Sequence, residues 1–248
     1  MKLFYECIDE NVDASTFTKT FCFEKDDYEK LGVSPDKVLK LFESVATEHA
    51  KKMGVGFEEM LSKNLLWVTM RIKYEVVNQP SPETNYKIAT YPSSKNMMEY
   101  DRDYLITDEN GKVFIKGQSK WCLIDAKTRH LVRMIQSITL SKQKPLFEER
   151  FLKTDIFEPQ FLPDHRYKIT EDDIDNNRHT NNTVYAKLVA YLLRNESREI
   201  KFFQINFLKE CVLDDSLELF LKQDAGNEFS ALGRFFNKEN SFSAKIKF

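Results

Sequence analysis

The densest group of polar side chains in the chain occupies residues 173–182, which read DIDNNRHTNN. His179 is the residue of this run best suited to proton transfer, because an imidazole with an unperturbed pKa of about 6.5 can donate or accept a proton at cellular pH. Asp175 or Asn177 could fix the tautomer and the orientation of the ring. Carboxylate, amide and imidazole groups this close together predict general acid–base chemistry in this part of the chain.

The same run precedes a segment with helical periodicity, so it ends at the start of a predicted helix. Unpaired backbone N–H groups and the positive end of the helix dipole would favour a developing oxyanion there. A second interpretation is purely structural, since Asx-rich loops form turns and cap helices, with Thr180 or Asn181 as the N-cap. Both interpretations remain open from the residues alone.

A second candidate is the pair Glu210-Cys211, which follows a run of strand-forming residues. A carboxylate beside a thiol can supply a base that activates water, or a nucleophile with its base. The alternative is a charged residue at a strand edge followed by a buried cysteine. Nothing else in the local pattern separates these two interpretations.

The cysteines are Cys7, Cys22, Cys122 and Cys211, which lie far apart and form no CxxC pair. This spacing favours neither a zinc site nor a disulfide framework, so each is predicted to be a buried free thiol. No histidine is followed by a second metal-type ligand at a useful spacing. We therefore expect no metal and no cofactor.

Charge and hydropathy exclude several classes of protein. Lys and Arg number 37 and Asp and Glu number 39, so the formal net charge of -2 argues against a polyanion binder, and we expect no nucleic-acid partner. No apolar run approaches the roughly 18 residues that a membrane span requires. The acidic residues in the first ten positions are unlike a signal or transit peptide, so a cytoplasmic location is expected.

The first predicted helix covers residues 34–53. Val38, Val45 and His49 belong to a series of apolar positions at steps of three and four, which places them on one face of a helix. Ser34 is the expected N-cap with Pro35 at the first helical position, and Gly54 marks the end. Strands are predicted after it over 66–77, 86–91, 98–107 and 112–125, with Asn110-Gly111 as a type I′ hairpin turn.

The same order returns in the second half of the chain. A helix is predicted over 181–194, with Val184, Leu188, Val189, Tyr191 and Leu192 on its buried face, and strands follow over 199–210, 216–223, 229–237 and 241–248. A long helix followed by antiparallel strands fits a sheet wrapped around a helix, the arrangement called a hot-dog fold. The fold class is therefore α+β, a tandem (double) hot-dog, with one unit over 1–145, a linker over 146–163 and a second unit over 164–248.

The polar run 173–182 with Tyr185, followed by Glu210-Cys211, resembles the signature of the acyl-ACP thioesterases of plant plastids and their bacterial relatives. The resemblance extends into the first half, through Asn64-Leu65-Leu66-Trp67-Val68 and residues 88–92, 102–106 and 119–125, and so spans nearly the whole chain. Family members usually have an apolar residue where Thr180 stands, and often one at Asn176. Neither departure removes a group that the chemistry needs.

The resemblance implies an enzyme that hydrolyses the thioester of fatty acyl-acyl carrier protein, which releases a free fatty acid and ends chain elongation. It also implies that Asp175, Asn177, His179 and Glu210 are catalytic and that Cys211 is an adjacent active-site position. Either carboxylate could be the base that deprotonates water, with His179 as its acid–base partner and Asn177 as an orienting group or carbonyl donor. A Cys211 thiolate that forms an acyl-enzyme is the alternative route.

By the same resemblance, the acyl chain is bound largely by the first unit. Val45, His49, Met53 and Trp67 are the predicted lining residues, and an ordinary core role is the alternative for all four. Acyl carrier protein is the expected partner, and because it is acidic, we expect a basic rim near the site. Tandem units pair within one chain, and a further homodimer is compatible with that organisation.

Two other functions use the same fold. A non-catalytic protein that binds or senses acyl thioesters would not need the four polar residues together. A dehydratase or hydratase of acyl thioesters also uses an acid and a histidine, but it leaves the thioester intact. The fold alone does not separate these functions from hydrolysis, whereas the combination of polar run and Glu-Cys pair favours hydrolysis.

Overall fold

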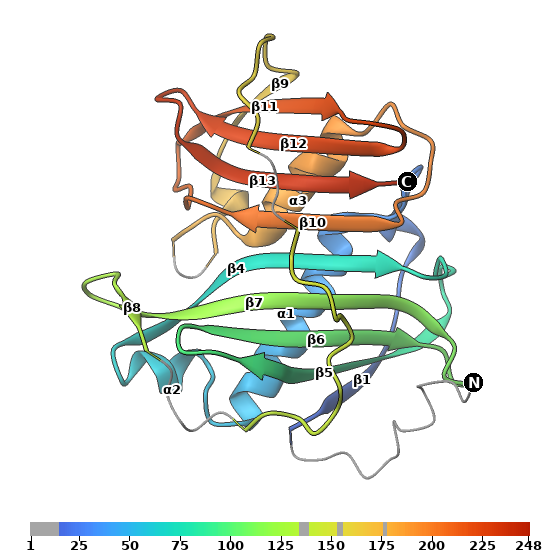
Figure 1. Ribbon diagram of the computed structural model, residues 1–248, viewed down its shortest axis with the longest axis vertical. Coiled ribbons are helices and arrows are strands. Elements are labelled where there is room, and N and C mark those ends of the chain that lie inside the picture. The colour runs from blue at the N-terminus through green and yellow to red at the C-terminus, as the bar shows by residue number, and fades with distance from the viewer. Residues whose placement is uncertain (1–14, 134–138, 153–155, 176–177) are drawn as a thin grey trace. The chain divides into compact units, whose positions relative to one another are not determined.

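The computed structural model describes residues 15–133, 139–152, 156–175 and 178–248 (Figure 1). The chain forms two compact units that do not correspond to a single cut in the sequence. The described residues of the first unit lie within 15–24, 41–70 and 74–150, and those of the second within 25–40, 71–73 and 151–248. Each unit is built mainly from antiparallel strands.

Along the chain, the structure contains two successive series of elements. The first series is β1 (Phe17–Cys22), η1 (Lys25–Asp27), β2 (Tyr28–Glu29), β3 (Gly32–Val33), α1 (Pro35–Lys52), α2 (Phe57–Leu61), β4 (Leu65–Val76), β5 (Asn85–Lys95), β6 (Glu99–Thr107), β7 (Val113–Asp125) and β8 (Leu131–Val132). The second is β9 (His165–Lys168), η2 (Glu171–Asp173), α3 (Asn182–Leu192), β10 (Phe202–Phe207), β11 (Ser216–Gln223), β12 (Glu228–Phe235) and β13 (Asn240–Lys247).

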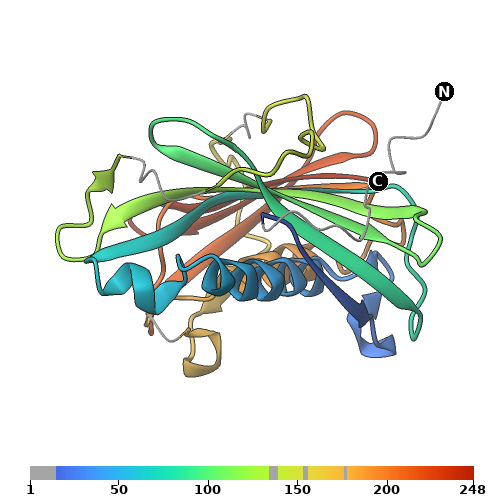
Figure 2. The ribbon, with the colours of Figure 1, turned by 90° about the horizontal axis from the view of Figure 1, so that it is seen from below.

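The two series repeat one topology. The first runs β4-β7-β6-β5-β1 across its sheet, and the second runs β10-β13-β12-β11-β9. In each, the first strand after the long helix borders the fourth strand after it, and the strand that opens the series, β1 or β9, lies at the far edge. A long helix lies against each of these sheets in Figures 1 and 2. The prediction of an α+β tandem hot-dog is therefore confirmed.

The segment that enters each long helix is also repeated, with one difference in length. A 3-10 turn ends at Asp27 in the first repeat and at Asp173 in the second. A small antiparallel pairing follows, between Tyr28 and Val33 in the first repeat and between Ile174 and Thr180 in the second. The second pairing encloses one more residue than the first, and that longer loop is the one that carries the polar run.

Helix α1 begins and ends where the sequence predicts. The carbonyl of Ser34 accepts from Lys37 and Val38, which makes Ser34 the first residue of the helical hydrogen-bond pattern. Its hydroxyl donates to Asp36. At the other end Gly54 has a φ of 68°, a left-handed conformation that is accessible to glycine without steric cost.

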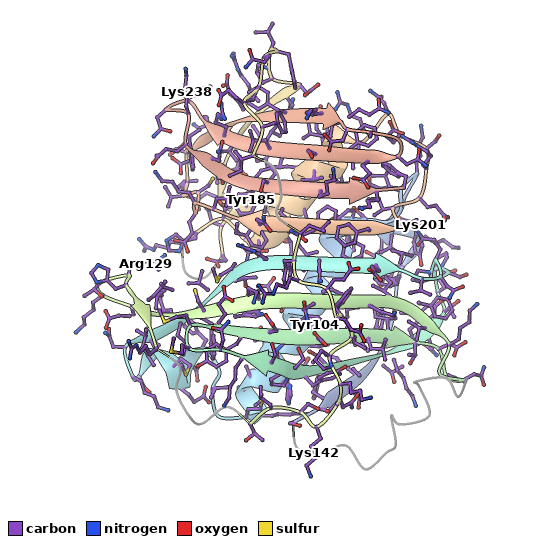
Figure 3. The ribbon with its side chains drawn as sticks, viewed as in Figure 1. Tyr104, Arg129, Lys142, Tyr185, Lys201 and Lys238 are labelled. Atoms are coloured by element: carbon purple, nitrogen blue, oxygen red, sulfur yellow. The ribbon has the colours of Figure 1, made fainter. Side chains whose placement is uncertain are left out.

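Aromatic packing holds α1 against the first sheet. Phe42 stacks on Tyr104 of β6 with ring centroids 4.2 Å apart and an interplanar angle of 7°. Gly117, the register partner of Tyr104 on β7, leaves room for the Phe42 ring, because a Cβ at 117 would lie 2.3 Å from it. Tyr104 lies within this sheet in Figure 3. The packing of α1 on the first sheet thus includes a close fit between the Phe42 ring and Gly117.

The turn between β6 and β7 differs from the prediction. Of Asn110 and Gly111, only Gly111 has a positive φ, 79°, so the turn is not type I′. The N–H of Gly111 donates to the carbonyl of Asp108, and the Asp108 carboxylate accepts the N–H groups of Asn110 and Lys112. The Asp108 side chain therefore organises a longer loop, and the glycine takes the one left-handed position.

Helix α3 buries most of the predicted face. Val184, Leu188, Val189 and Leu192 are buried, but Tyr191 is 43% exposed and the prediction for it is wrong. Its ring lies 4.6 Å from that of His165 and under the guanidinium of a neighbouring arginine. This tyrosine thus contacts a histidine ring and an arginine side chain at the surface instead of packing in the core.

The cysteines follow the prediction only in part. Cys122 and Cys211 are buried free thiols, whereas Cys22 is free but exposed, because it ends the edge strand β1. Cys7 lies outside the described residues. Among the helices that the structure describes, none has the length and apolar character to cross a membrane.

A buried carboxylate holds the segment that leaves the first sheet. Asp103 on β6 has no exposed surface, and its carboxylate accepts hydrogen bonds from Ser93, Gln118 and the backbone N–H of Leu146 at 2.7–2.9 Å. Burial raises the pKa of Asp103 to about 6, against the opposing effect of these three donors, and nearby Asp101 adds to the rise. The described residues around Leu146 form no helix or strand, so this bond fixes an irregular segment to the sheet.

Asp103→Asn should remove a pH dependence of stability. Because the pKa is raised on folding, the wild-type carboxyl favours the folded state below pH 4, and this advantage is lost as the pH rises through 6. The rise from 3.8 to about 6 corresponds to roughly 3 kcal/mol. We expect the unfolding free energy of wild type, relative to Asp103→Asn, to fall by about that amount between pH 4 and pH 7 in urea titrations. A constant difference would contradict this account.

Candidate active site

The loop between η2 and α3 is closed by hydrogen bonds between its own ends. The N–H of Asp175 donates to the carbonyl of His179 at 2.8 Å, and the Asp175 carboxylate accepts the His179 N–H at 3.2 Å. Arg178, with a φ of 62°, donates its N–H to the Asp175 carbonyl at 3.0 Å. Asp175 thus sets the backbone from which the imidazole extends. Asn177, the remaining predicted residue of this loop, lies outside the described residues.

The loop after β10 carries the second candidate. The sequence predicts a strand to residue 210, but β10 ends at Phe207. The backbone N–H groups of Leu208 and Lys209 both donate to the carbonyl of Ser241, at 2.8 and 3.0 Å, which bends the chain out of the strand. Glu210 therefore lies in a loop and is exposed rather than at the end of a strand.

Thr180 and Tyr185 join these two loops. The backbone N–H and the hydroxyl of Thr180 both donate to the carbonyl of Cys211, at 2.9 and 3.0 Å. The N–H of Cys211 donates in turn to the Tyr185 hydroxyl at 3.0 Å. Tyr185 lies between α3 and the second sheet, against Phe207 and Phe242 (Figure 3). Sequence reasoning missed these bonds, because no local pattern indicates a partner 31 positions away.

The joined loops bring His179 and Glu210 together. Nε2 of His179 lies 3.4 Å from Oε2 of Glu210, although the two residues are far apart in the chain. The two side chains are 32% and 43% exposed, so solvent and a substrate can reach both groups. An accessible imidazole beside a carboxylate can polarise water and move a proton.

Cys211 is buried, unlike its exposed neighbour Glu210. Its side chain has no exposed surface, and Sγ lies 3.1 Å from the hydroxyl oxygen of Ser241. Burial raises the pKa of the Cys211 thiol, and it also raises the pKa of Tyr185. A thiol in this environment is protonated near neutral pH and is a poor nucleophile.

The structural interpretation of the polar run also holds in part. Asn181 is the N-cap of α3, and its side-chain oxygen accepts the N–H of Thr183 at 2.8 Å. Asp173 satisfies the preceding 3-10 turn, since its carboxylate accepts from Thr170 and from the hydroxyl of Tyr167. The run therefore contains both residues that shape the loop and the residue that meets Glu210.

The predicted acyl-binding residues all belong to the first unit. Val45 and His49 are buried, with exposures of 0% and 2%, and Nδ1 of His49 lies 2.9 Å from a guanidinium nitrogen of Arg102. Met53 and Trp67 are half-buried and pack against the core cluster that contains Met60. All four pack in the interior of that unit or at its border, and a lining role for them stays a prediction. Among the described residues, no group of three or more His, Cys, Asp or Glu side chains is arranged to hold a metal ion.

Two domains of one family match most of the chain. Residues 16–141 match the acyl-ACP thioesterase N-terminal domain, and residues 160–247 match its C-terminal domain. A chloroplastic acyl-(acyl-carrier-protein) hydrolase of Cuphea viscosissima is 26% identical over 218 residues, 79% of this chain and 52% of the relative. The chloroplastic dodecanoyl-(acyl-carrier-protein) hydrolase of Cinnamomum camphora is 24% identical over 241 residues, 87% of this chain and 62% of the relative. The chain thus spans about half to three fifths of the length of these relatives.

Solved structures share the fold. An acyl-ACP thioesterase from Bacteroides thetaiotaomicron superposes with a TM-score of 0.85 at 21% identity, covering 94% of this chain and 98% of that one. The 12:0-ACP thioesterase from Umbellularia californica gives a TM-score of 0.81 at 20% identity, covering 95% and 98%. Because the two family domains together cover more than half of the sequence, this chain belongs to the acyl-ACP thioesterase family.

Proposed function

We propose that this protein hydrolyses the thioester of a fatty acyl-acyl carrier protein and releases a free fatty acid and the carrier thiol. The observation that carries the proposal is the approach of His179 Nε2 to Glu210 Oε2, 3.4 Å apart and both accessible. Family membership supplies the reaction class, and several relatives are named for hydrolysis of acyl-ACP. A protein that only binds or senses acyl thioesters would not need this pair.

In the proposed mechanism, the Glu210 carboxylate takes a proton from water while the oxygen attacks the thioester carbon. His179, beside Glu210, exchanges a proton with it and protonates the departing thiolate when the C–S bond breaks. The products are a carboxylic acid and a thiol, so atoms and protons balance without a further reactant. Asp175 has a positioning role, since its carboxylate accepts the backbone N–H of His179. We also propose that Asn177 orients the water or the thioester carbonyl, as the family pattern implies.

The buried state of Cys211 favours direct attack by water over an acyl-enzyme. Cys211→Ala should therefore keep kcat within about threefold of wild type, because the thiol has no exposed surface and burial raises its pKa. The check is steady-state release of carrier thiol, together with mass spectrometry of quenched reactions. A loss of more than about 100-fold, together with an acyl group trapped on Cys211 in wild type, would establish the covalent route instead.

We also propose that the two repeats have different roles. We place the acyl pocket in an N-terminal hot-dog over 1–145, with Val45, His49, Met53 and Trp67 as its lining, and catalysis in a C-terminal hot-dog over 164–248, joined by a linker over 146–163. A cytoplasmic location and a homodimer belong to the proposal as well. The relatives from Cuphea and Cinnamomum are chloroplastic by name.

The test is a panel of acyl-ACPs of different chain length, with carrier thiol detected by a thiol-reactive dye and free fatty acid quantified by mass spectrometry. Stoichiometric release of both products by wild type supports hydrolysis. Binding without release would identify a sensing protein. Hydration of an enoyl-ACP without thiol release would identify a hydratase.

A further inference from the structure

We propose that the two joined loops also form the docking surface for the carrier protein, through three apolar side chains beside Glu210 and one cation beside His179. This inference rests on the proposed function and adds to it the residues that recognise the partner. The surface, called here the carrier face, consists of Arg178, Leu208, Val212 and Leu213.

Exposed apolar side chains flank the candidate base along its loop. Leu208 and Val212 are each 45% exposed and Leu213 is 39% exposed, on the loop that carries Glu210. Side chains of this kind usually turn inward, and three so close together on one loop mark a contact surface.

Hydrogen bonds hold this loop in shape. The carbonyl of Cys211 accepts two bonds from Thr180, and Val212 and Asp215 exchange bonds, with the N–H of Val212 donating to the Asp215 carboxylate at 2.8 Å. The N–H of Asp214 donates to the carbonyl of Ile169 at 3.2 Å. The apolar side chains are therefore presented by an ordered backbone.

The cation of the carrier face is Arg178. Its side chain is exposed, and within the described part of the chain no carboxylate pairs with it. Two acidic residues of the loop after β10 have partners of their own, since Asp214 pairs with Lys168 at 2.8 Å and the Asp215 carboxylate accepts the N–H of Val212. An arginine with a φ of 62° costs backbone energy that glycine would not. A cation that has no carboxylate partner in the described part of the chain suits an acidic protein partner.

The position of the carrier face beside the candidate active site favours the carrier protein as its binding partner. The thioester must reach His179 and Glu210 on an arm of finite length, so the carrier docks within the reach of that arm, and the loops that bear these residues lie within it. Carrier proteins are acidic, so Arg178 complements their charge, and the three apolar residues supply the desolvated centre that a docking surface needs. A second copy of this chain has no comparable requirement to approach the site.

The experiment compares acyl-ACP with acyl-pantetheine that carries the same acyl chain but no protein. Arg178→Glu and the double variant Val212→Ser/Leu213→Ser should each raise KM for acyl-ACP by about tenfold, with kcat/KM for acyl-pantetheine within twofold of wild type. Added salt should raise KM of wild type and lower KM of Arg178→Glu, because it screens an attraction in the first and a repulsion in the second.

Matched controls separate docking from general effects. Lys201→Glu reverses a charge at the opposite end of β10 (Figure 3), and Leu162→Ser removes an apolar side chain that is 85% exposed. Both control variants should leave the kinetic constants for acyl-ACP and acyl-pantetheine unchanged. Circular dichroism verifies that all variants fold.

Two results would overturn the inference, namely an equal loss of activity on both substrates or an unchanged KM for acyl-ACP in the variants. In the second case, light scattering that shows a wild-type dimer broken by Val212→Ser/Leu213→Ser would mean that the apolar residues face a second copy. Failure of wild type to hydrolyse either substrate would instead reject the proposed function.

Discussion

Glu210→Gln is expected to lower kcat for acyl-ACP hydrolysis by about 10²–10⁴-fold, the usual contribution of a positioned general base. The amide keeps the size of the side chain but cannot take a proton from water, while Nε2 of His179 still has a neighbour at the 3.4 Å position. KM should change little, since on the proposed function the carboxylate acts on water rather than on the acyl chain. Single-turnover release of carrier thiol measures the effect on the chemical step directly.

The control for this variant is Glu218→Gln, which removes a carboxylate from the same unit without touching the joined loops. Glu218 pairs with Arg166 at 2.9 Å at the surface, so its loss should leave kcat unchanged. His179→Ala should cost about as much as Glu210→Gln, and the double variant little more, because the two groups act as a unit. Near-normal turnover by Glu210→Gln would mean that another group activates the water, with Asp175 the next candidate.

Phe42→Ala is expected to lower the free energy of unfolding by about 3–5 kcal/mol, the range for truncation of a fully buried phenylalanine. Phe42 is 1% exposed, stacks on Tyr104, and fills the space above Gly117. Its loss therefore removes buried apolar surface and leaves a cavity between α1 and the sheet. Urea denaturation followed by fluorescence and far-UV circular dichroism measures the change.

A second substitution tests whether the fit between Phe42 and Gly117 is specific. Gly117→Ala alone should destabilise by about 1–3 kcal/mol, because the new Cβ would lie 2.3 Å from the Phe42 ring. In the Phe42→Ala background the added methyl enters the cavity, so its cost should largely disappear. Additive effects of the two changes would show that the ring and the glycine do not share one space.

Elements with a local signal were predictable from the sequence. The start of α1 at Pro35 and its end before Gly54 follow from residues within one turn of each terminus. The alternation of apolar residues located β4, β6 and β7 to within a residue or two. Each of these depends on neighbours in the chain, and this is the information that periodicity contains.

Elements defined by distant partners were not predictable. β1 and β9 are short edge strands that exist because they pair with β5 and β11, and their own residues carry a weak pattern. The turn at Gly111 depends on the side chain of Asp108, which competes with the tighter turn that the dipeptide alone favours.

The residue types of the candidate site were predictable from the sequence, but their spatial arrangement was not. The residue types at 175, 179 and 210 indicated acid–base chemistry, and the family resemblance selected them from other polar residues. Their approach, however, depends on the bonds from Thr180 to the Cys211 carbonyl, which no local pattern reveals. Likewise, the exposure of Glu210 depends on β10 ending at Phe207.

The single additional residue enclosed by the Ile174–Thr180 pairing, compared with Tyr28–Val33, separates two halves that are otherwise built alike. The shorter loop reads YEKLGV and contains neither histidine nor asparagine. The two repeats therefore share a strand order and differ in this loop, which carries the candidate catalytic residues only in the second repeat. On the proposed function, each polypeptide processes one thioester at a time, and a tight inhibitor would saturate at one equivalent per chain rather than two.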